Sequence, residues 1–230
     1  MKFVCMKKDD IAKAIADRIV SIINSKEKPI LGLATGSTPL PLYNELVKRY
    51  EEGKVSFKKV TSFNLDEYLG LNPDNDQSYR YFMNHHLFDH IDINKDNTNF
   101  PSVDNYAVYD KMIEDAGGVD LQVLGIGSNG HIAFNEPGTP FESLTHVTKL
   151  AESTIKDNSR FFESIDEVPK EAISMGLSSI LKSKRIVLIA GLNKSRIIGE
   201  LKKEIITENI PASILNKHNN TTIYIEKAGN

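Results

Sequence analysis

Short runs of consecutive apolar residues recur along the chain, and they alternate with longer stretches in which apolar residues fall at helical spacing. A run of four or five apolar residues bounded by turn formers is typical of a strand buried on both faces of a sheet. Such runs predict strands at 2–6, 30–34, 60–65, from 121 onward, 147–150, 186–190 and 222–225. Helical spacing predicts helices at 9–23, 39–50, 78–90, 106–116, 154–162, 194–201 and 211–215.

This alternation of strands and helices predicts an α/β fold. We expect three layers, with an open, mostly parallel sheet covered by helices on both faces and joined by right-handed crossovers. The 230 residues, of which 40% are hydrophobic, can build one sizeable core, and no linker or internal repeat interrupts them. We therefore predict a single domain spanning residues 1–230.

Four polar segments follow the predicted strands, where parallel sheets bind ligands at their carboxyl ends. They are Thr35–Thr38, Asp66, the stretch from Asn129 to Glu136, and Lys194. In the first, Gly36 turns the chain and Thr35, Ser37 and Thr38 add hydroxyl donors just before a helix that we expect to begin at Pro39, with Thr38 as its cap. Free N–H groups at that helix start would form a phosphate cradle, although a plain capped helix start explains the stretch equally well.

Three glycines at Gly125, Gly127 and Gly130 fit the G-x-G-x-x-G pattern of dinucleotide-binding domains. That motif requires a long helix directly after the third glycine. Pro137 and Pro140 leave room for less than two turns, so the fold is expected to be Rossmann-like without binding a dinucleotide.

Charge and composition exclude several functional classes. The net charge of −3 gives no basic footprint for nucleic acid, and no apolar run approaches the ~20 residues of a membrane span. Together with a polar amino-terminal segment, this predicts a cytoplasmic protein. Cys5 is the single cysteine, and helix packing accounts for His85, His86 and His90, so neither a disulfide nor a metal site is expected.

The candidate residues fall into two chemical groups. The Gly36 cradle, Lys194 and Arg160 can hold an anion, because a lysine at a helix start opposes the helix dipole and is better explained as a ligand for negative charge. Asp66, His131 and Glu136 can move protons, although Asp66 and its neighbour Glu67 could also cap a helix or face water. The prediction is acid–base chemistry without metal or cofactor on a small phosphorylated substrate.

Four runs then resemble the glucosamine-6-phosphate deaminase family in order and spacing, over nearly the whole chain. They are residues 31–39 (LGLATGSTP), 63–68 (FNLDEY), 125–137 (GIGSNGHIAFNEP) and 158–162 (NSRFF). The resemblance implies conversion of glucosamine 6-phosphate and water to fructose 6-phosphate and ammonia. It further implies that His131 assists opening of the sugar ring, that Asn129 and Glu136 orient it, and that Asp66 shuttles a proton between C2 and C1. The cradle, Arg160 and Lys194 would hold the phosphate.

Two departures from the family bear on pH dependence and regulation. Asn129 stands where some members have Asp, which should shift the pH optimum rather than abolish activity. His146 and Thr148 occupy positions that are basic in hexameric, allosteric members, so we expect no activation by N-acetylglucosamine 6-phosphate and a monomer or small homo-oligomer. Residues 147–163 are a candidate lid that would bring Arg160 to the phosphate.

Two other functions remain open at this stage. A 6-phosphogluconolactonase would share the fold and the cradle, but it does not need Asp66 for enolisation. A phosphosugar-sensing domain of a repressor would bind the same ligand without turnover.

Overall fold

A seven-stranded parallel sheet forms the centre of the molecule, which is a computed structural model describing residues 1–159 and 162–228. The strands lie in the order β1-β10-β9-β6-β2-β3-β5, and every pairing is parallel. Their bounds are β1 (Lys2–Met6), β2 (Ile30–Leu33), β3 (Thr61–Asn64), β5 (Thr98–Asn99), β6 (Leu121–Leu124), β9 (Ile186–Ala190) and β10 (Thr221–Glu226). Every residue of β2, β6 and β9 is buried, as expected of strands covered on both faces.

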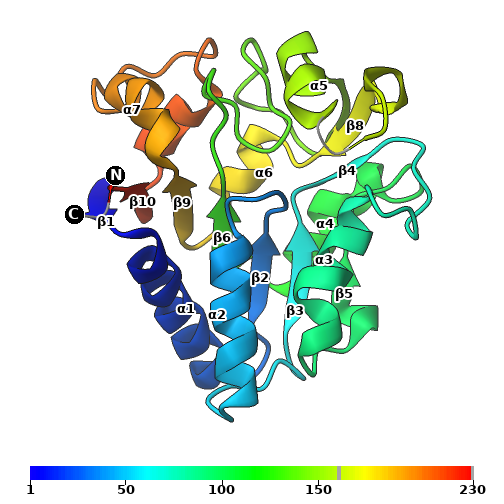
Figure 1. Cartoon of the computed structure of the whole chain (residues 1–230), viewed down its shortest axis with the longest axis vertical. Coiled ribbons are helices and arrows are strands. Elements are labelled where there is room, and N and C mark those ends of the chain that lie inside the picture. Colours follow the sequence, from blue (N-terminus) through cyan, green and yellow to red (C-terminus); the bar gives the residue numbers. More distant parts are fainter. Residues whose placement is uncertain (160–161, 229–230) are drawn as a thin grey trace.

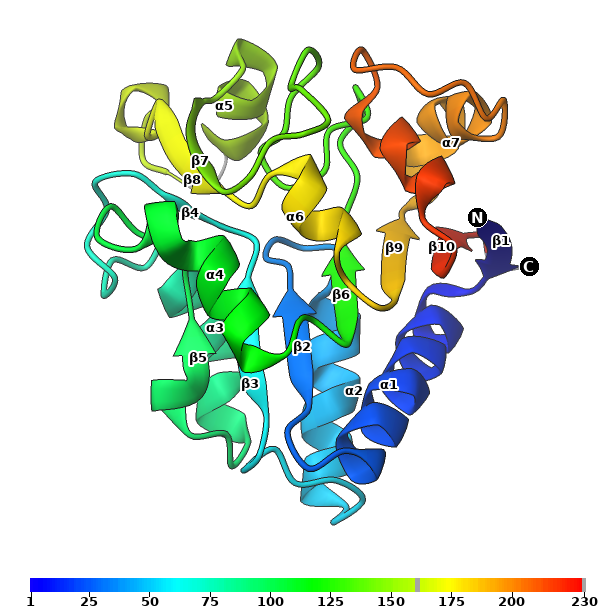
Figure 2. The same ribbon diagram turned by 180° about the vertical axis from the view of Figure 1, so that it is seen from behind.

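Helices cover both faces of this sheet (Figure 1, Figure 2). One face carries α1 (Lys8–Ser25), α2 (Leu40–Glu51) and α3 (Tyr79–His86), and the other carries α4 (Tyr106–Ala116) and α6 (Leu177–Leu181). Two further helices, α5 (Glu152–Asn158) and α7 (Ser195–Leu201), lie beyond the carboxyl ends of the strands. The three-layer α/β prediction is therefore confirmed. Within the described part of the chain, no helix is both long and apolar enough to cross a membrane.

The described residues also form short 3-10 helices. They are η1 (Phe88–His90), η2 (Lys95–Asn97), η4 (Ile165–Glu167), η5 (Leu192–Lys194) and η6 (Pro211–Lys217). The helix expected over 78–90 thus ends at His86 and continues, after Leu87, as η1. The helix expected over 154–162 begins and ends earlier, as α5.

A second, three-stranded antiparallel sheet lies above the carboxyl ends of the main strands, in the order β4-β8-β7 (Figure 1). It consists of β4 (Asp66–Tyr68), β7 (His146–Lys149) and β8 (Glu171–Ser174). The sequence pattern did not predict this sheet, although a short strand was expected at 147–150. Because β4 follows β3 after the single residue Leu65, Asp66 sits where the chain leaves one sheet and enters the other.

The order of the main sheet places a topological switch point between β2 and β6. From β2 the chain proceeds outward to β3 and β5, whereas β6, β9 and β10 lie on the other side. Open α/β sheets bind ligands in the crevice outside the carboxyl ends at such a point. The loops that leave β2 and β6 carry the Gly36 cradle and the glycine-rich turn, so the fold brings these two segments together.

Close packing between β2 and β6 depends on the absence of a side chain at Gly32. A Cβ at Gly32 would lie 2.0 Å from Oε1 of the fully buried Gln122. Gly32→Ala should therefore lower the free energy of unfolding by roughly 1–3 kcal/mol, as for other overpacked cores. Urea unfolding measures the change.

Gly199 provides the matched control, because it lies exposed in α7 and a Cβ there would meet nothing within 4 Å. Gly199→Ala should raise stability by about 0.5–1 kcal/mol, since alanine loses less conformational entropy in a helix. Equal effects at both glycines would contradict the packing argument.

Candidate active site

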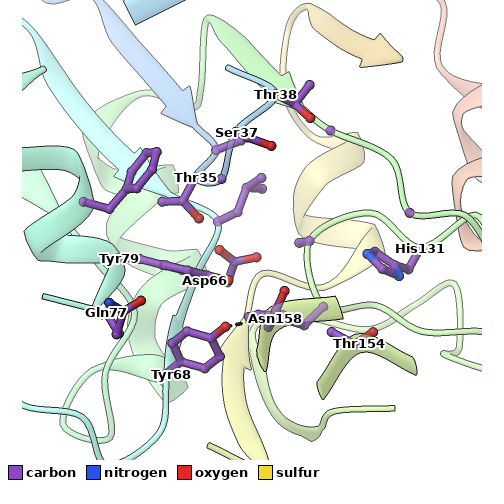
Figure 3. A pocket seen from close by; sticks show the side chains of 18 of the residues that line it. Thr35, Ser37, Thr38, Asp66, Tyr68, Gln77, Tyr79, His131, Thr154 and Asn158 are labelled. Atoms are coloured by element: carbon purple, nitrogen blue, oxygen red, sulfur yellow. Dashed lines mark hydrogen bonds between the residues drawn. The ribbon is translucent and has the colours of Figure 1, made fainter. Parts of the chain in front are cut away.

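A cavity of about 490 Å³ opens at the carboxyl ends of the strands, between the two sheets. Most of the residues predicted from the sequence line it: Thr35, Gly36, Ser37, Thr38, Asp66, His131 and Lys194. Figure 3 shows the hydroxyls of Thr35, Ser37 and Thr38 on one side, Asp66 near the middle and His131 across from it. Asn129 and Glu136 lie behind His131 rather than on the wall, and Arg160 lies outside the described residues.

The first predicted segment forms a turn that leads into α2. Gly36 has φ +89°, a left-handed conformation that glycine adopts without strain. The expected start of the helix was wrong by one residue: α2 begins at Leu40, Pro39 is its N-cap residue, and Thr38 does not cap it. No described side chain caps this helix, so its first N–H donors and positive dipole end remain available to an anion.

Lys194 reaches the same cavity from the opposite side of the switch point. It ends η5 after strand β9 and occupies the N-cap position of α7. A cation there is unfavourable for the helix dipole, so its presence on the cavity wall favours a role as an anion ligand.

The two adjacent carboxylates of β4 have separate roles because alternate residues of a strand face opposite sides. Glu67 accepts backbone hydrogen bonds of 2.9 Å from Tyr68, Tyr79 and Arg80, and the last two belong to the first turn of α3. The sequence left open whether Asp66 and Glu67 act in proton transfer, cap a helix or face water. In the structure Glu67 caps α3 and Asp66 faces the cavity.

Asp66 is held in an environment that disfavours its charge. Asp66 is 6% exposed, and no described residue donates a hydrogen bond to its carboxylate. Burial, with a smaller contribution from the charge of Glu67, raises the pKa of Asp66 to about 8. A carboxylate that is unpaired, buried and on a cavity wall has the properties of a general base.

His131 is positioned by the glycine-rich turn that follows β6. Gly127 N–H donates to the His131 carbonyl at 2.9 Å, and a Cβ at Gly127 would lie only 2.3–2.6 Å from three ring atoms of His131. The imidazole therefore lies directly against Gly127. Gly130, with φ +88°, completes the turn, and a side chain there would clash with Ile210.

Behind the imidazole, Glu136 is held by several polar groups. Its Oε2 accepts a 2.7 Å hydrogen bond from the Asn129 amide and lies 3.5 Å from Nδ1 of His131, while its Oε1 accepts from the Thr154 hydroxyl. Burial opposes ionisation of Glu136, but hydrogen bonding and charge from His131, aided by Thr154 and Asn129, outweigh it and lower its pKa. An ionised Glu136 favours the proton on the buried Nδ1 of His131 and leaves Nε2 as the acceptor nitrogen.

Asn129 links both ends of this arrangement. Its Oδ1 accepts from the backbone N–H of His131 at 3.1 Å while its Nδ2 donates to Glu136. An aspartate could not make the second bond, because an ionised carboxylate only accepts.

Several residues of the site were not anticipated from the sequence. The cavity wall also contains Tyr68, Tyr79, Phe134, Thr154, Asn158 and Phe162. The ring of Tyr68 lies 4.8 Å from that of Tyr79, 5.8 Å from Phe134 and 5.9 Å from Phe162, centroid to centroid. A strand assignment for 66–68 would have placed Tyr68 on the face of Asp66, and helical spacing would have placed Thr154 and Asn158 on one face of α5.

The three clustered histidines pack around α3 and η1. The ring of His86 lies 4.5 Å from Phe82 and 4.8 Å from His85, and Nε2 of His90 lies 2.9 Å from the His85 carbonyl oxygen. Among the described residues, no group of three or more His, Cys, Asp or Glu side chains could hold a metal ion.

The sequence is similar to those of known proteins over nearly its whole length. Residues 7–224 match a family described as glucosamine-6-phosphate isomerases/6-phosphogluconolactonase. A glucosamine-6-phosphate deaminase from Mycoplasma mycoides is 51% identical, over 99% of this chain and 95% of its own length. One from Bacillus pumilus is 49% identical, over 96% and 94%.

Solved structures give the same grouping. A monomeric glucosamine-6-phosphate deaminase superposes with a TM-score of 0.95 at 40% identity, over 99% of this chain and 98% of its own. A 6-phosphogluconolactonase from Thermotoga maritima superposes with a TM-score of 0.77 at 21% identity, over 98% and 99% of the two chains. At that identity the second comparison shows a shared fold alone.

The burial of Asp66 predicts a stability penalty that depends on pH. An unfolded aspartate loses its proton near pH 4, whereas native Asp66 keeps it to about pH 8, so the native state binds more protons in between. Wild-type stability should therefore fall relative to Asp66→Asn as the pH rises through this window. We expect Asp66→Asn to be more stable by roughly 1–3 kcal/mol at pH 8 and by little at pH 4.

Urea unfolding of both proteins across this pH range measures the difference. Asp74→Asn, at an exposed loop position, is the matched control and should follow the wild type throughout. A difference between Asp66→Asn and wild type that does not change with pH would contradict the burial of an ionisable Asp66.

Proposed function

The chain belongs to the glucosamine-6-phosphate isomerase/6-phosphogluconolactonase family, and we propose that it converts glucosamine 6-phosphate and water to fructose 6-phosphate and ammonia. One observation supports this most: a buried carboxylate that no described residue pairs with, and a His–Glu pair, share a cavity with an anion cradle. Relatives about half identical over nearly the full chain are glucosamine-6-phosphate deaminases, which agrees with this chemistry.

Ring opening is the first step that we propose. The substrate enters as a pyranose, and His131 moves the proton between the C1 hydroxyl and the ring oxygen so that the C1–O bond to the ring breaks. Glu136 keeps the imidazole in the tautomer that leaves Nε2 as acceptor, and Asn129 fixes Glu136. These side chains supply the proton transfers without a cofactor.

Isomerisation follows at Asp66. The carboxylate removes the proton from C2, next to the C1 aldehyde, and returns it to C1 as the enolamine becomes a C2 imine. Water then adds to C2 and ammonia leaves. The high pKa of Asp66 makes it a strong base, and the positive charge of the substrate's amino group favours its ionised form once the substrate is bound.

Phosphate binding would fix the orientation of the sugar carbons. Thr35, Gly36, Ser37 and Thr38 offer hydroxyl and backbone donors at the start of α2, and Lys194 adds a positive charge. We propose that Arg160 joins them, as the family resemblance implies. Binding energy at the phosphate lowers the barrier at C2 by holding the reacting atoms in line with Asp66.

Two other functions predict different assay results. A 6-phosphogluconolactonase would hydrolyse the lactone and release no ammonia from glucosamine 6-phosphate, and a sensor domain would bind the phosphosugar without turnover. A coupled assay for ammonia, run beside lactone hydrolysis, separates the three. We expect ammonia release; lactone hydrolysis alone, or binding alone, would contradict the proposal.

We further propose that the chain acts as a monomer or small oligomer in the cytoplasm, without activation by N-acetylglucosamine 6-phosphate. The similarity to a monomeric deaminase supports the assembly state. His146 and Thr148 supply no fixed positive charges for a second phosphosugar. A charged sugar phosphate does not cross a bilayer unaided, which supports the location.

Residues 147–163 are proposed to act as a lid. The described part contains most of β7 and all of α5, and Thr154, Asn158 and Phe162 lie on the cavity wall. Closure of this segment over the phosphosugar would exclude water from the enolamine.

Substitutions at the two ends of the cavity should affect different kinetic constants. Asp66→Asn should lower kcat by about two to four decades with KM nearly unchanged, as expected for loss of a general base. Lys194→Ala should mainly raise KM, because it removes an anion ligand remote from the reacting carbons. Initial rates of ammonia release measure both, and near-full activity of Asp66→Asn would show the mechanism to be wrong.

The lid proposal predicts ligand-dependent protection. Hydrogen–deuterium exchange of amides in 147–163 should slow when Asp66→Asn, which binds without rapid turnover, is saturated with glucosamine 6-phosphate. Strand β9 is buried throughout and serves as the internal control. Unchanged exchange in 147–163 would rule out closure.

A further inference from the structure

Helix α5 contacts both halves of the proton-transfer machinery through two side chains one turn apart. Thr154 and Asn158 are separated by four residues and therefore lie on the same face of the helix. Thr154 donates to Oε1 of Glu136, and Asn158 donates to the Tyr68 hydroxyl at 2.8 Å. Figure 3 shows the two side chains beside each other, between His131 and Tyr68.

The bond from Thr154 determines how Glu136 faces His131. Asn129 and His131 both engage Oε2 of Glu136, so Thr154 is the described partner of Oε1. With donors on both oxygens, the carboxylate cannot rotate about its terminal bond without losing a hydrogen bond. Thr154 is 5% exposed, and its removal would leave Oε1 unpaired in a largely buried site.

The bond from Asn158 acts on the strand that carries Asp66. Tyr68 is two residues from Asp66 on the same face of β4, and its ring packs against Tyr79, Phe134 and Phe162. β4 has three residues and pairs with β8 alone, at the edge of the small sheet. A hydrogen bond from α5 to Tyr68 therefore restrains a short edge strand whose other cavity-facing residue is the proposed base.

We infer that α5 sets the relative position of the His131–Glu136 pair and Asp66, with Thr154 and Asn158 as positioning residues for ring opening and for proton transfer at C2. The inference rests on the proposed function and deepens it. Both contacts come from the same helix, so a displacement of α5 would disturb ring opening and proton transfer at C2 together.

Thr154→Val tests the first contact, because it removes the hydroxyl at nearly constant volume. We expect kcat for ammonia release to fall about tenfold to a hundredfold, as for loss of a hydrogen bond to a charged group, with KM within about threefold. Loss of a donor to the carboxylate also raises the pKa of Glu136, so a ¹³C NMR titration of the Glu136 carboxyl should give a higher midpoint than in the wild type. His131 is the titratable group in contact with Glu136.

Two matched variants accompany it. Thr154→Ser keeps the hydroxyl and should retain most of the activity and the wild-type titration midpoint of Glu136. Thr61→Val makes the same change at the amino end of β3, away from the cavity wall, and should match the wild type. Full activity of Thr154→Val with an unmoved Glu136 midpoint would overturn the role of Thr154.

A double-mutant cycle with Glu136→Gln separates positioning from a general structural effect. If Thr154 acts through Glu136, adding Thr154→Val to Glu136→Gln should cost less than twofold more. An equal loss in both backgrounds would show that Thr154 acts independently of Glu136 and would overturn the inference.

The second contact is tested by Asn158→Ala and Tyr68→Phe, each of which removes one partner. Each should lower kcat, and the double variant should be no slower than the slower single variant. Full activity of either single variant would overturn the link from α5 to β4. A wild-type protein that released no ammonia would contradict both the inference and the proposed function, whereas an active wild type with indifferent variants contradicts the inference alone.

Discussion

The site depends on the position of the Asp66 carboxylate. It is buried where the parallel sheet passes into the small antiparallel sheet, and no described residue donates a hydrogen bond to it. Leu65 ties the two sheets by accepting from Met175 N–H and donating to the Leu33 carbonyl. Asp66 lies opposite Ser174 in the β4–β8 pairing, and the Ser174 hydroxyl accepts from Phe134 N–H at 3.1 Å. Through these bonds Asp66, the turn after β6 and the small sheet form one framework.

This framework separates charges by environment. No described residue donates to Asp66, and burial raises its pKa to about 8, whereas hydrogen bonding and charge from His131, with Thr154 and Asn129, lower the pKa of Glu136. Glu67, adjacent to Asp66 in sequence, accepts hydrogen bonds from the backbone at the start of α3. Carboxyl groups of similar intrinsic acidity thus take the proposed roles of base and orienting group and the observed role of helix cap, and the hydrogen bonds available to each favour that role.

Six of the seven strands of the main sheet were predictable because their signals are local, whereas the two-residue edge strand β5 was not predicted. Residues 186–190 are five consecutive apolar residues, and the strand occupies the predicted positions. The small sheet was not, because Asp66–Tyr68 contains two acidic residues and becomes a strand only by pairing with β8, more than a hundred residues later. The start of α2 was misplaced because Pro39 fits the N-cap position as well as the first turn.

For the site, too, features with a local sequence signal were predictable, whereas contacts between distant segments were not. Most of the predicted residues at strand ends lie together on the cavity wall, since parallel strands end at one edge. Glu67 as a helix cap, and Thr154 and Asn158 as contacts of Glu136 and Tyr68, depend on how loops fold back over that edge, which spacing does not reveal. The most direct test of the account is a ¹³C NMR titration of the Asp66 carboxyl in the ligand-free protein, assigned by its absence in Asp66→Asn. The account predicts a midpoint near pH 8; a midpoint near the ordinary aspartate value of about 4 would contradict it.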